Sequence, residues 1–305
     1  MEGFRVLYQM TGLKAKLLCL QLLSFLLVLS SFGAVFGAEG QTNYTSKSGT
    51  IRIALIHLDA RPGEVEHNRQ QIEAAIKDAA ANSANWIVTP ELAETGYRFT
   101  ERIGTSWIEP FPSRWVQRLS SIAKERKVAL FIGIAEKDIT SGKLHNSVVV
   151  IGRDGVIQGT YRKHRVVNGP AERWASKGGE NNLFLVDGIP IGLLICADSY
   201  KPEQAMRYAA MGAKMLISPA NWPPHGSMGP KDYWEKRSKE SGLPLIVNNR
   251  TGKEPELDFR PGESVLAVAG SKLYSFKSET TRVFYLDWNP TANSFTSPEN
   301  NAAQK

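Results

Sequence analysis

The chain has 305 residues, of which 42% are hydrophobic and 22% charged, and its formal net charge at pH 7 is +7. Its lysines and arginines are scattered, with no basic stripe interleaved with aromatic residues, which argues against a nucleic-acid-binding protein. Only Cys19 and Cys196 accompany a few scattered histidines, so we expect neither a metal site nor a cofactor.

Residues 1–38 have the layout of a secretory signal peptide. Arg5, Lys14 and Lys16 precede an almost wholly apolar run over residues 17–36, and Gly37 and Ala38 offer a cleavage site. The run is also long enough to span a bilayer, so an uncleaved membrane anchor over residues 17–36 is the alternative. We therefore predict an exported protein, periplasmic or secreted, that contacts a membrane only if this segment is kept.

Apolar runs and helical patterns alternate along the body of the chain. Residues 51–58 predict a strand buried on both faces, because apolar side chains occupy both alternating sets of positions. Residues 66–81, 114–126 and 202–211 predict helices, because apolar residues recur three and four positions apart. The other predicted strands are residues 86–89, 128–135, 146–151, 156–161, 183–186, 189–195, 215–218, 245–248, 264–267, 272–276 and 282–286.

Helices interleaved with buried strands, together with antiparallel hairpins, predict an α/β layered fold with mixed sheets. The turn sequences of the hairpins are residues 153–155 (RDG) and 187–188 (DG). We find no internal repeat and no interior linker, and therefore predict one domain over residues 51–288. A polar spacer at residues 39–50 precedes it, and a polar C-terminal tail at residues 289–305, which we expect to fray, follows it.

Three reactive side chains follow predicted strands. Glu91 comes after residues 86–89, Lys163 after residues 156–161 and Cys196 after residues 189–195. Ligands of α/β sheets gather beyond the carboxyl ends of strands, so these three side chains are candidates for one site. A carboxylate can act as the base for a thiol, and an ammonium can stabilise the thiolate and the oxyanion of an addition intermediate. The set therefore suffices for covalent acyl transfer without histidine.

Each of these residues also has an ordinary structural interpretation. Glu91 could be a carboxylate at a helix start, and Glu94 competes with it as the base. Lys163 stands in a basic cluster and could be a surface charge. An isolated buried cysteine is more often inert packing than a nucleophile.

The sequences around these residues favour the catalytic interpretation. Residues 90–97 (PELAETGY), 161–163 (YRK) and 192–198 (GLLICAD) resemble, in order, the three signature blocks of the nitrilase superfamily of carbon–nitrogen hydrolases. The likeness covers residues 51 to about 286 and indicates the amidase-like branch. It implies a four-layer α-β-β-α sandwich that forms homodimers or higher homo-oligomers.

The resemblance also implies a role for each residue. Glu91 corresponds to the general base, Lys163 to the cation that stabilises the intermediate, and Cys196 to the nucleophile. Glu172 stands where many members carry a second glutamate, although a surface salt bridge would also explain it. The backbone N–H of Ala197 corresponds to a second oxyanion donor.

Further aromatic and polar residues are candidates for the substrate pocket. We expect Tyr97, Asn221 and Trp222 to contact substrate, with aromatic packing as the alternative for the two rings. The sequence departs from the family at residues 164–165 and 197–200, which concerns the pocket wall and hence the choice of substrate.

The resemblance predicts hydrolysis of a small-molecule amide to a carboxylic acid and ammonia or an amine, through a cysteine thioester. Nitrile hydrolysis is a weaker alternative, because nitrile-cleaving members often carry Trp-Glu after the cysteine, whereas Ala197 and Asp198 follow it here. N-acyl transfer on the same scaffold and a catalytically silent binding protein are further alternatives. A cysteine protease using His164 or His225 is the remaining one, and no protease signature surrounds either histidine.

Overall fold

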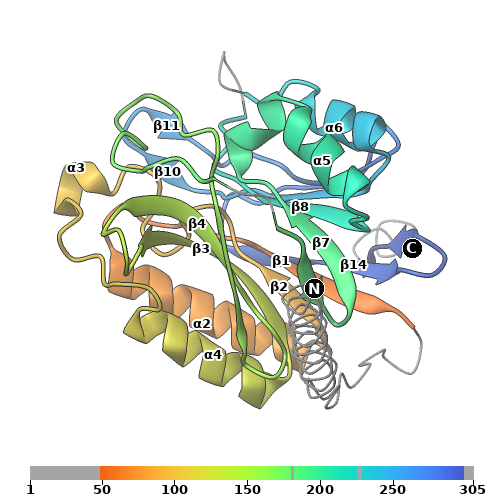
Figure 1. The fold of residues 1–305 in the computed structure, drawn as a ribbon, viewed down its shortest axis with the longest axis horizontal. Coiled ribbons are helices and arrows are strands. Elements are labelled where there is room, and N and C mark those ends of the chain that lie inside the picture. The colour runs from red at the N-terminus through yellow and green to blue at the C-terminus, as the bar shows by residue number, and fades with distance from the viewer. Residues whose placement is uncertain (1–48, 180–181, 225–228, 299–305) are drawn as a thin grey trace, which may run out of the picture. The chain divides into compact units, whose positions relative to one another are not determined.

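Two mixed β-sheets lie face to face at the centre of the folded domain (Figure 1). The computed structural model describes residues 49–179, 182–224 and 229–298, which fall within one compact unit, Tyr44–Lys305. The predicted signal peptide or anchor at residues 1–38, most of the spacer at residues 39–50, and His225 lie outside the described residues. Within the described ranges, no helix has both the length and the apolar character needed to cross a membrane.

The larger sheet, sheet A, has seven strands in the described part of the chain, in the order β15-β14-β1-β2-β3-β4-β5. Strands β1, β2 and β3 are parallel, and the other neighbouring pairs are antiparallel. The strands are β1 (Ile51–His57), β2 (Trp86–Val88), β3 (Ala129–Lys137), β4 (Leu144–Ile151), β5 (Ile157–Arg162), β14 (Arg282–Asn289) and β15 (Ser294–Thr296).

The second sheet, sheet B, has six strands among the described residues, in the order β13-β12-β9-β8-β7-β6, with β7, β8 and β9 parallel. Its strands are β6 (Phe184–Val186), β7 (Ile189–Leu193), β8 (Met215–Pro219), β9 (Leu245–Asn248), β12 (Ser264–Val268) and β13 (Ser271–Phe276). A small hairpin, β10 (Lys253–Glu254) and β11 (Leu257–Asp258), stands apart from both sheets.

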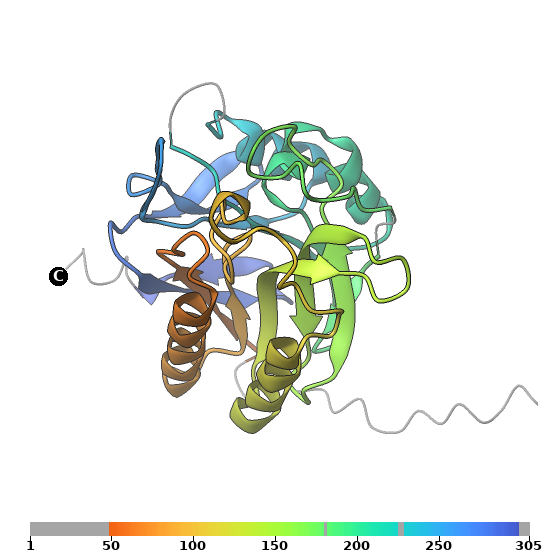
Figure 2. The same ribbon diagram turned by 90° about the vertical axis from the view of Figure 1, so that its left-hand side faces the viewer.

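Helices cover the outer face of each sheet. On sheet A lie α2 (Val65–Ala81) and α4 (Arg114–Arg126), seen together in Figure 2. On sheet B lie α5 (Glu203–Ala210) and α6 (Tyr233–Ser241). The short helices are α3 (Thr100–Ile103) and the 3₁₀ helix η1 (Cys196–Tyr200). The layers therefore run α-β-β-α, which confirms the predicted fold class.

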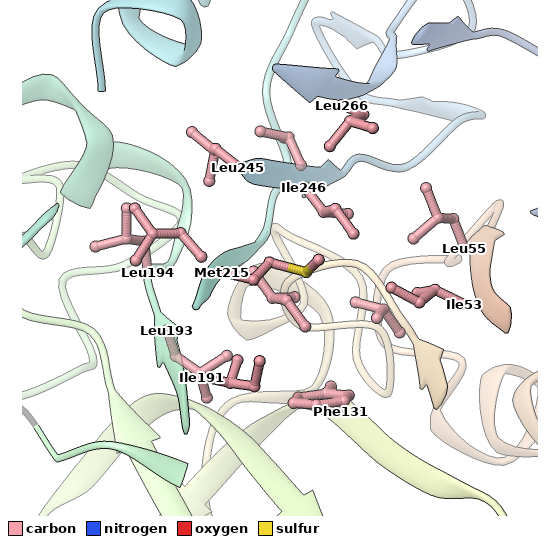
Figure 3. Close-up of a cluster of buried hydrophobic side chains, with 14 of the residues drawn as sticks. Ile53, Leu55, Phe131, Ile191, Leu193, Leu194, Met215, Leu245, Ile246 and Leu266 are labelled. Atoms are coloured by element: carbon pink, nitrogen blue, oxygen red, sulfur yellow. The ribbon is translucent and has the colours of Figure 1, made fainter. Parts of the chain in front are cut away.

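The alternation of side chains in sheet A explains why its strands are apolar on both faces. In β1, Ile53 and Leu55 point into the core between the sheets, whereas Ala54 and Ile56 pack against the helices outside. Figure 3 shows Ile53, Leu55 and Phe131 of sheet A opposite Met215 and Ile246 of sheet B. This inter-sheet core fixes both sheets, and thereby the strand ends from which the reactive residues extend.

Local sequence explains the ends and the packing of the helices. The Ser113 hydroxyl accepts a hydrogen bond from Val116 N at 3.3 Å and begins α4, as an N-cap should. On the other face of the molecule, Gly192 of β7 allows α5 to lie close to sheet B. A Cβ atom at Gly192 would lie 2.6 Å from the Tyr208 ring, which is too close.

Several short elements were not predicted, namely α3, η1, β10 and β11, and neither were α6 and β15. Helix α6 has a weak apolar pattern, because its buried positions are Trp234 and the polar residues Arg237 and Ser238. The tail was expected to fray from residue 289, but β14 extends to Asn289 and β15 pairs with its end. Phe295 makes this possible, since its ring stacks on Trp288 with centroids 6.1 Å apart.

Candidate active site

Three charged side chains meet in the buried interior, and two of them lie just beyond the ends of strands. Lys163 follows β5 directly, and its Nζ atom lies 2.6 Å from Oε1 of Glu91, which follows β2. The same ammonium donates a hydrogen bond to Oε1 of Glu172. All three side chains are fully buried. The structure thus brings together the predicted acid, the predicted lysine and the second glutamate.

Two asparagines hold the Glu91 carboxylate in place. Asn146 Nδ2 donates to Oε1 at 2.7 Å, and the Asn221 backbone N–H donates to Oε2 at 2.9 Å. Asn221 Nδ2 also donates to the Glu91 backbone carbonyl at 2.9 Å. Both carboxylate oxygens therefore accept fixed hydrogen bonds, which orient the group.

Asn146 was not among the predicted site residues. It lies in β4 next to Ser147, ahead of the apolar residues that end the strand, and it is fully buried. A buried side-chain amide in an apolar strand needs hydrogen-bond partners. An asparagine in this strand was therefore the signal available in the sequence. Gly133 in the neighbouring β3 also matters, because a Cβ atom there would collide with the Pro90 carbonyl oxygen beside Glu91.

Cys196 occupies a strained position at the start of η1, just beyond the end of β7. Its φ angle of 46° lies in the left-handed region, which costs a residue other than glycine about 1–3 kcal/mol. It is buried and is the sole cysteine among the described residues. A protein retains such backbone strain when neighbouring contacts hold the residue in this conformation, as they do for Cys196.

Asp198 makes the contacts that hold this backbone conformation. Its Oδ2 atom accepts hydrogen bonds from Ile195 N at 2.9 Å and from the Tyr161 hydroxyl at 2.8 Å. Its Oδ1 atom accepts one from Arg165 N at 2.7 Å. Asp198 therefore closes the turn that carries Cys196 and ties it to the segment that follows Lys163. The sequence showed this residue only as part of a signature block.

The charges around the thiol have opposing effects. Burial and the Glu91 carboxylate raise the pKa of the Cys196 thiol well above its ordinary value, against the opposing effects of Lys163 and the Asn221 N–H. Burial would lower the pKa of Lys163, but Glu91 and Glu172 raise it well above its ordinary value. The site therefore favours the protonated thiol and the charged ammonium.

Glu172 has the pKa that falls near neutrality. Burial raises the pKa of this carboxyl to about 7, although the charge of Lys163 acts in the opposite direction. Its Oε2 atom accepts a hydrogen bond from Val167 N at 2.8 Å. A surface salt bridge is therefore the wrong description of Glu172, which is a buried member of the charged cluster.

Glu94, the competing base, belongs to a different cluster. Its Oε1 atom forms an ion pair with Arg69 of α2 at 2.5 Å. Its backbone carbonyl accepts from Asn68 Nδ2 at 3.1 Å. Burial raises the pKa of Glu94, and Arg69 opposes this. The lysine of the site contacts Glu91 and not Glu94, so the geometry favours Glu91 as the base.

Two of the predicted pocket residues, Tyr97 and Trp222, have different surroundings. Tyr97 is buried, and its pKa is raised well above the ordinary value first by burial and then by the charge of Glu172. Its hydroxyl has no hydrogen-bond partner among the described residues. Trp222, by contrast, packs edge-on against Tyr200 and Trp234, with centroids 5.5 and 5.3 Å away. Ala197 is buried beside Cys196 in η1.

Other candidates have structural partners. His164 stacks on the Tyr161 ring with centroids 5.5 Å apart, and His225 lies outside the described residues. Asn249, which begins a glycosylation triplet in the sequence, is buried, and its Nδ2 atom donates to the Trp222 carbonyl at 2.9 Å. In the part of the chain that the structure describes, no group of histidine, cysteine and acidic residues could hold a metal ion.

Known proteins resemble this chain over most of the folded domain. The sequence matches the family described as carbon-nitrogen hydrolase over residues 52–285. A nitrilase from Pyrococcus abyssi is 30% identical over 235 residues, which cover 75% of this chain and 86% of that protein. An N-carbamoylputrescine amidase from Solanum lycopersicum is 28% identical over 245 residues, which cover 75% of this chain and 79% of that protein.

Solved structures share the fold. One is a mutant of the amidase from Nesterenkonia sp. AN1, which shows covalent addition of the acetamide moiety of fluoroacetamide at its active site cysteine. It superposes with a TM-score of 0.68 at 22% identity and covers 83% of this chain and 96% of its own.

Proposed function

The chain belongs to the carbon–nitrogen hydrolase family, in the amidase-like branch of the nitrilase superfamily, and we propose that it hydrolyses small-molecule amides through a thioester on Cys196. The observation that carries the proposal is the buried position of Lys163, which contacts both Glu91 and Glu172 beside the thiol. A lysine between two carboxylates in a dry interior needs a reason, since burying three charges is costly. Acyl transfer on the thiol supplies that reason.

The first half of the reaction forms the thioester. Glu91 takes the thiol proton as the sulfur of Cys196 bonds to the carbonyl carbon of the amide. The oxygen gains negative charge, which Lys163 and the Ala197 N–H stabilise. The intermediate then collapses, the carbon–nitrogen bond breaks, and protonated Glu91 gives its proton to the departing amine.

The second half releases the acid. Water bonds to the carbonyl carbon while a carboxylate takes its proton. The carbon–sulfur bond then breaks, and the carboxyl group returns that proton to the departing sulfur, which restores the thiol. Glu91 acts as the base again, with help from Glu172. The pKa of Glu172 near 7 suits this role, because a base whose pKa lies near the working pH is both available and effective.

The test uses two readouts on purified protein. Wild-type protein should release ammonia from aliphatic amides. A Glu91→Gln variant, which lacks the proposed base and cannot complete turnover, should gain the mass of one acetamide group from fluoroacetamide, as a mutant of the Nesterenkonia amidase does. The Cys196→Ala variant should do neither while keeping its thermal unfolding midpoint. Ammonia release that persists in the Cys196→Ala variant would remove the proposal, and so would a Cys196 thiol that fluoroacetamide leaves unmodified in the Glu91→Gln variant.

The same experiment separates the alternatives. Hydroxylamine added during turnover intercepts a thioester as a hydroxamate, and a transferase should favour such an acceptor over water. A nitrile hydrolase should release ammonia from nitriles faster than from the matching amides. A silent binding protein should show no turnover of either.

We also propose that the protein is exported and that it forms homodimers. The apolar run at residues 17–36 supports export. Met206 on α5 and Met211 at its C-terminal cap are 46% and 40% exposed, as expected of a surface that a second copy covers. Cell fractionation with N-terminal sequencing tests export, and retention in the membrane fraction would indicate the anchor. Light scattering tests dimer formation, and a monomeric mass would contradict it.

A further inference from the structure

One segment, residues 164–172, has a hollow on each side. The first hollow has a volume of about 350 Å³ and includes Tyr97 and Glu172 in its wall. The second has a volume of about 620 Å³ and includes Asp198 and Tyr200. Val167 and Asn168 line both hollows, so the segment separates them. We call them the inner hollow and the outer hollow.

The inner hollow reaches the charged cluster. Its wall contains Glu172, which contacts Lys163, and Tyr97, whose phenol is close enough to Glu172 and Cys196 for their charges to affect its pKa. The wall of the outer hollow contains neither Tyr97 nor Glu172. Tyr200 of the outer hollow is also near Cys196, but only the inner hollow has a wall residue that contacts Lys163. A substrate whose carbonyl oxygen faces Lys163 therefore extends most directly into the inner hollow.

The remaining wall of the inner hollow is mostly apolar. Val167, Pro170, Ala171 and Leu257 contribute carbon surface. The Tyr97 hydroxyl, which has no partner among the described residues, offers one hydrogen bond. An apolar wall with a few polar groups is the usual composition of a small-molecule site.

The one cation in the wall of the inner hollow is already neutralised. Arg98 pairs with Glu101 at 2.8 Å and with Glu256 at 3.0 Å. A carboxylate entering the inner hollow would therefore lose its water without gaining a free cation, which is unfavourable. The outer hollow is different, because Arg165, Lys177 and Lys201 line it and form no ion pair within the described ranges.

From these observations we propose that the inner hollow binds the acyl group of the substrate, and that the enzyme selects uncharged amides with an apolar acyl chain. This inference rests on the proposed amidase function. A primary amide releases ammonia, which needs no cavity of this size, so the hollow serves the acyl side. The Tyr97 hydroxyl would contact the substrate, and Leu257 would set the preference for apolar chains.

The test compares two amides of similar length in ammonia release by the full chain. Pentanamide carries an apolar acyl chain, and succinamate carries a carboxylate at the corresponding end. Wild-type kcat/KM should favour pentanamide by about tenfold or more. The Leu257→Arg variant, which adds a cation to the wall, should shift this ratio toward succinamate by about tenfold. A matched control is Leu185→Arg, since Leu185 is 53% exposed on β6 and should leave the ratio unchanged.

The outcomes separate this inference from the function on which it rests. Amide turnover with equal or greater kcat/KM for succinamate would overturn the inference alone and would favour the cationic outer hollow. An unchanged ratio in the Leu257→Arg variant, if it is folded and active, would also overturn it. No turnover of any amide by the wild-type protein, with a Cys196 thiol unreactive to fluoroacetamide in the Glu91→Gln variant, would overturn the proposed function together with the inference.

Discussion

Asn146 Nδ2 lies 2.7 Å from Oε1 of Glu91, the same carboxylate oxygen that accepts the hydrogen bond from Lys163 Nζ. The backbone carbonyl of Asn146 also accepts the backbone N–H of Lys163 at 2.8 Å. One residue of β4 thus positions both the proposed base and the proposed oxyanion-binding cation. We therefore propose that Asn146 is a positioning residue for both groups.

Replacement of Asn146 by alanine should therefore lower kcat by about a hundredfold, because Glu91 loses the hydrogen bond that orients it toward the thiol. KM should change little, as expected of a residue that acts by positioning Glu91. Steady-state kinetics with a primary amide measures both values. Asn82→Ala, the same change at an exposed helix end, should leave both unchanged. A variant with normal kcat would show that Asn146 only fills space.

The activity of the wild-type enzyme should rise as the pH increases through about 7. Burial raises the pKa of Glu172 from 4.5 to about 7, so its carboxylate, the form that helps to activate water, appears only above that pH. The pH profile of kcat measures this acid limb. Glu172→Gln has no such titration and should lose the limb along with much of its activity. A wild-type acid limb near pH 4.5 would contradict the role of Glu172.

The fold could be predicted where the pattern of apolar residues along a strand matches the faces that the structure buries. In β1, both alternating sets of side chains are apolar, and the structure buries both. The rule that reactive groups follow strand ends placed Glu91 and Lys163, which the structure brings into contact. Local pattern was too weak for α6, whose stability depends on Trp234 packing against distant parts of the chain.

The site was less predictable where one residue acts on another far away in the sequence. Asn146 lies 55 positions from Glu91, and Asp198 lies 37 positions from Tyr161, so neither contact has a local signal. The left-handed backbone of Cys196 is likewise imposed by its surroundings, since cysteine has no preference for it. The candidate reactive groups were visible in the sequence, and the residues that hold them in place were not.

Asp198→Asn should destabilise the protein by about 1–3 kcal/mol, because an amide nitrogen would face groups that now donate to a carboxylate oxygen. Activity should fall as well, since the turn that carries Cys196 loses its closing hydrogen bonds. Chemical denaturation and kcat provide the two measurements. Tyr161→Phe removes a single hydrogen bond to Asp198 and should cost only about 1 kcal/mol. Equal effects in the two variants would argue against a special role for the carboxylate.

Removal of the ammonium should have the largest effect on stability. Lys163→Met leaves Glu91 and Glu172 buried without their shared cation, and breaking a buried ion pair costs about 3–5 kcal/mol. Protonation of the carboxylates relieves this cost, and protons bind more readily at low pH. The free energy of unfolding of the variant, relative to wild type, should therefore fall as the pH rises from about 5 to about 8. Denaturation at both pH values measures this trend. The double variant Lys163→Met, Glu172→Gln keeps only one buried carboxylate without a cation. It should therefore recover part of the lost free energy of unfolding at the higher pH, and it should remain inactive. A loss that is equal at both pH values would mean that lysine packing, and not its charge, holds the site together.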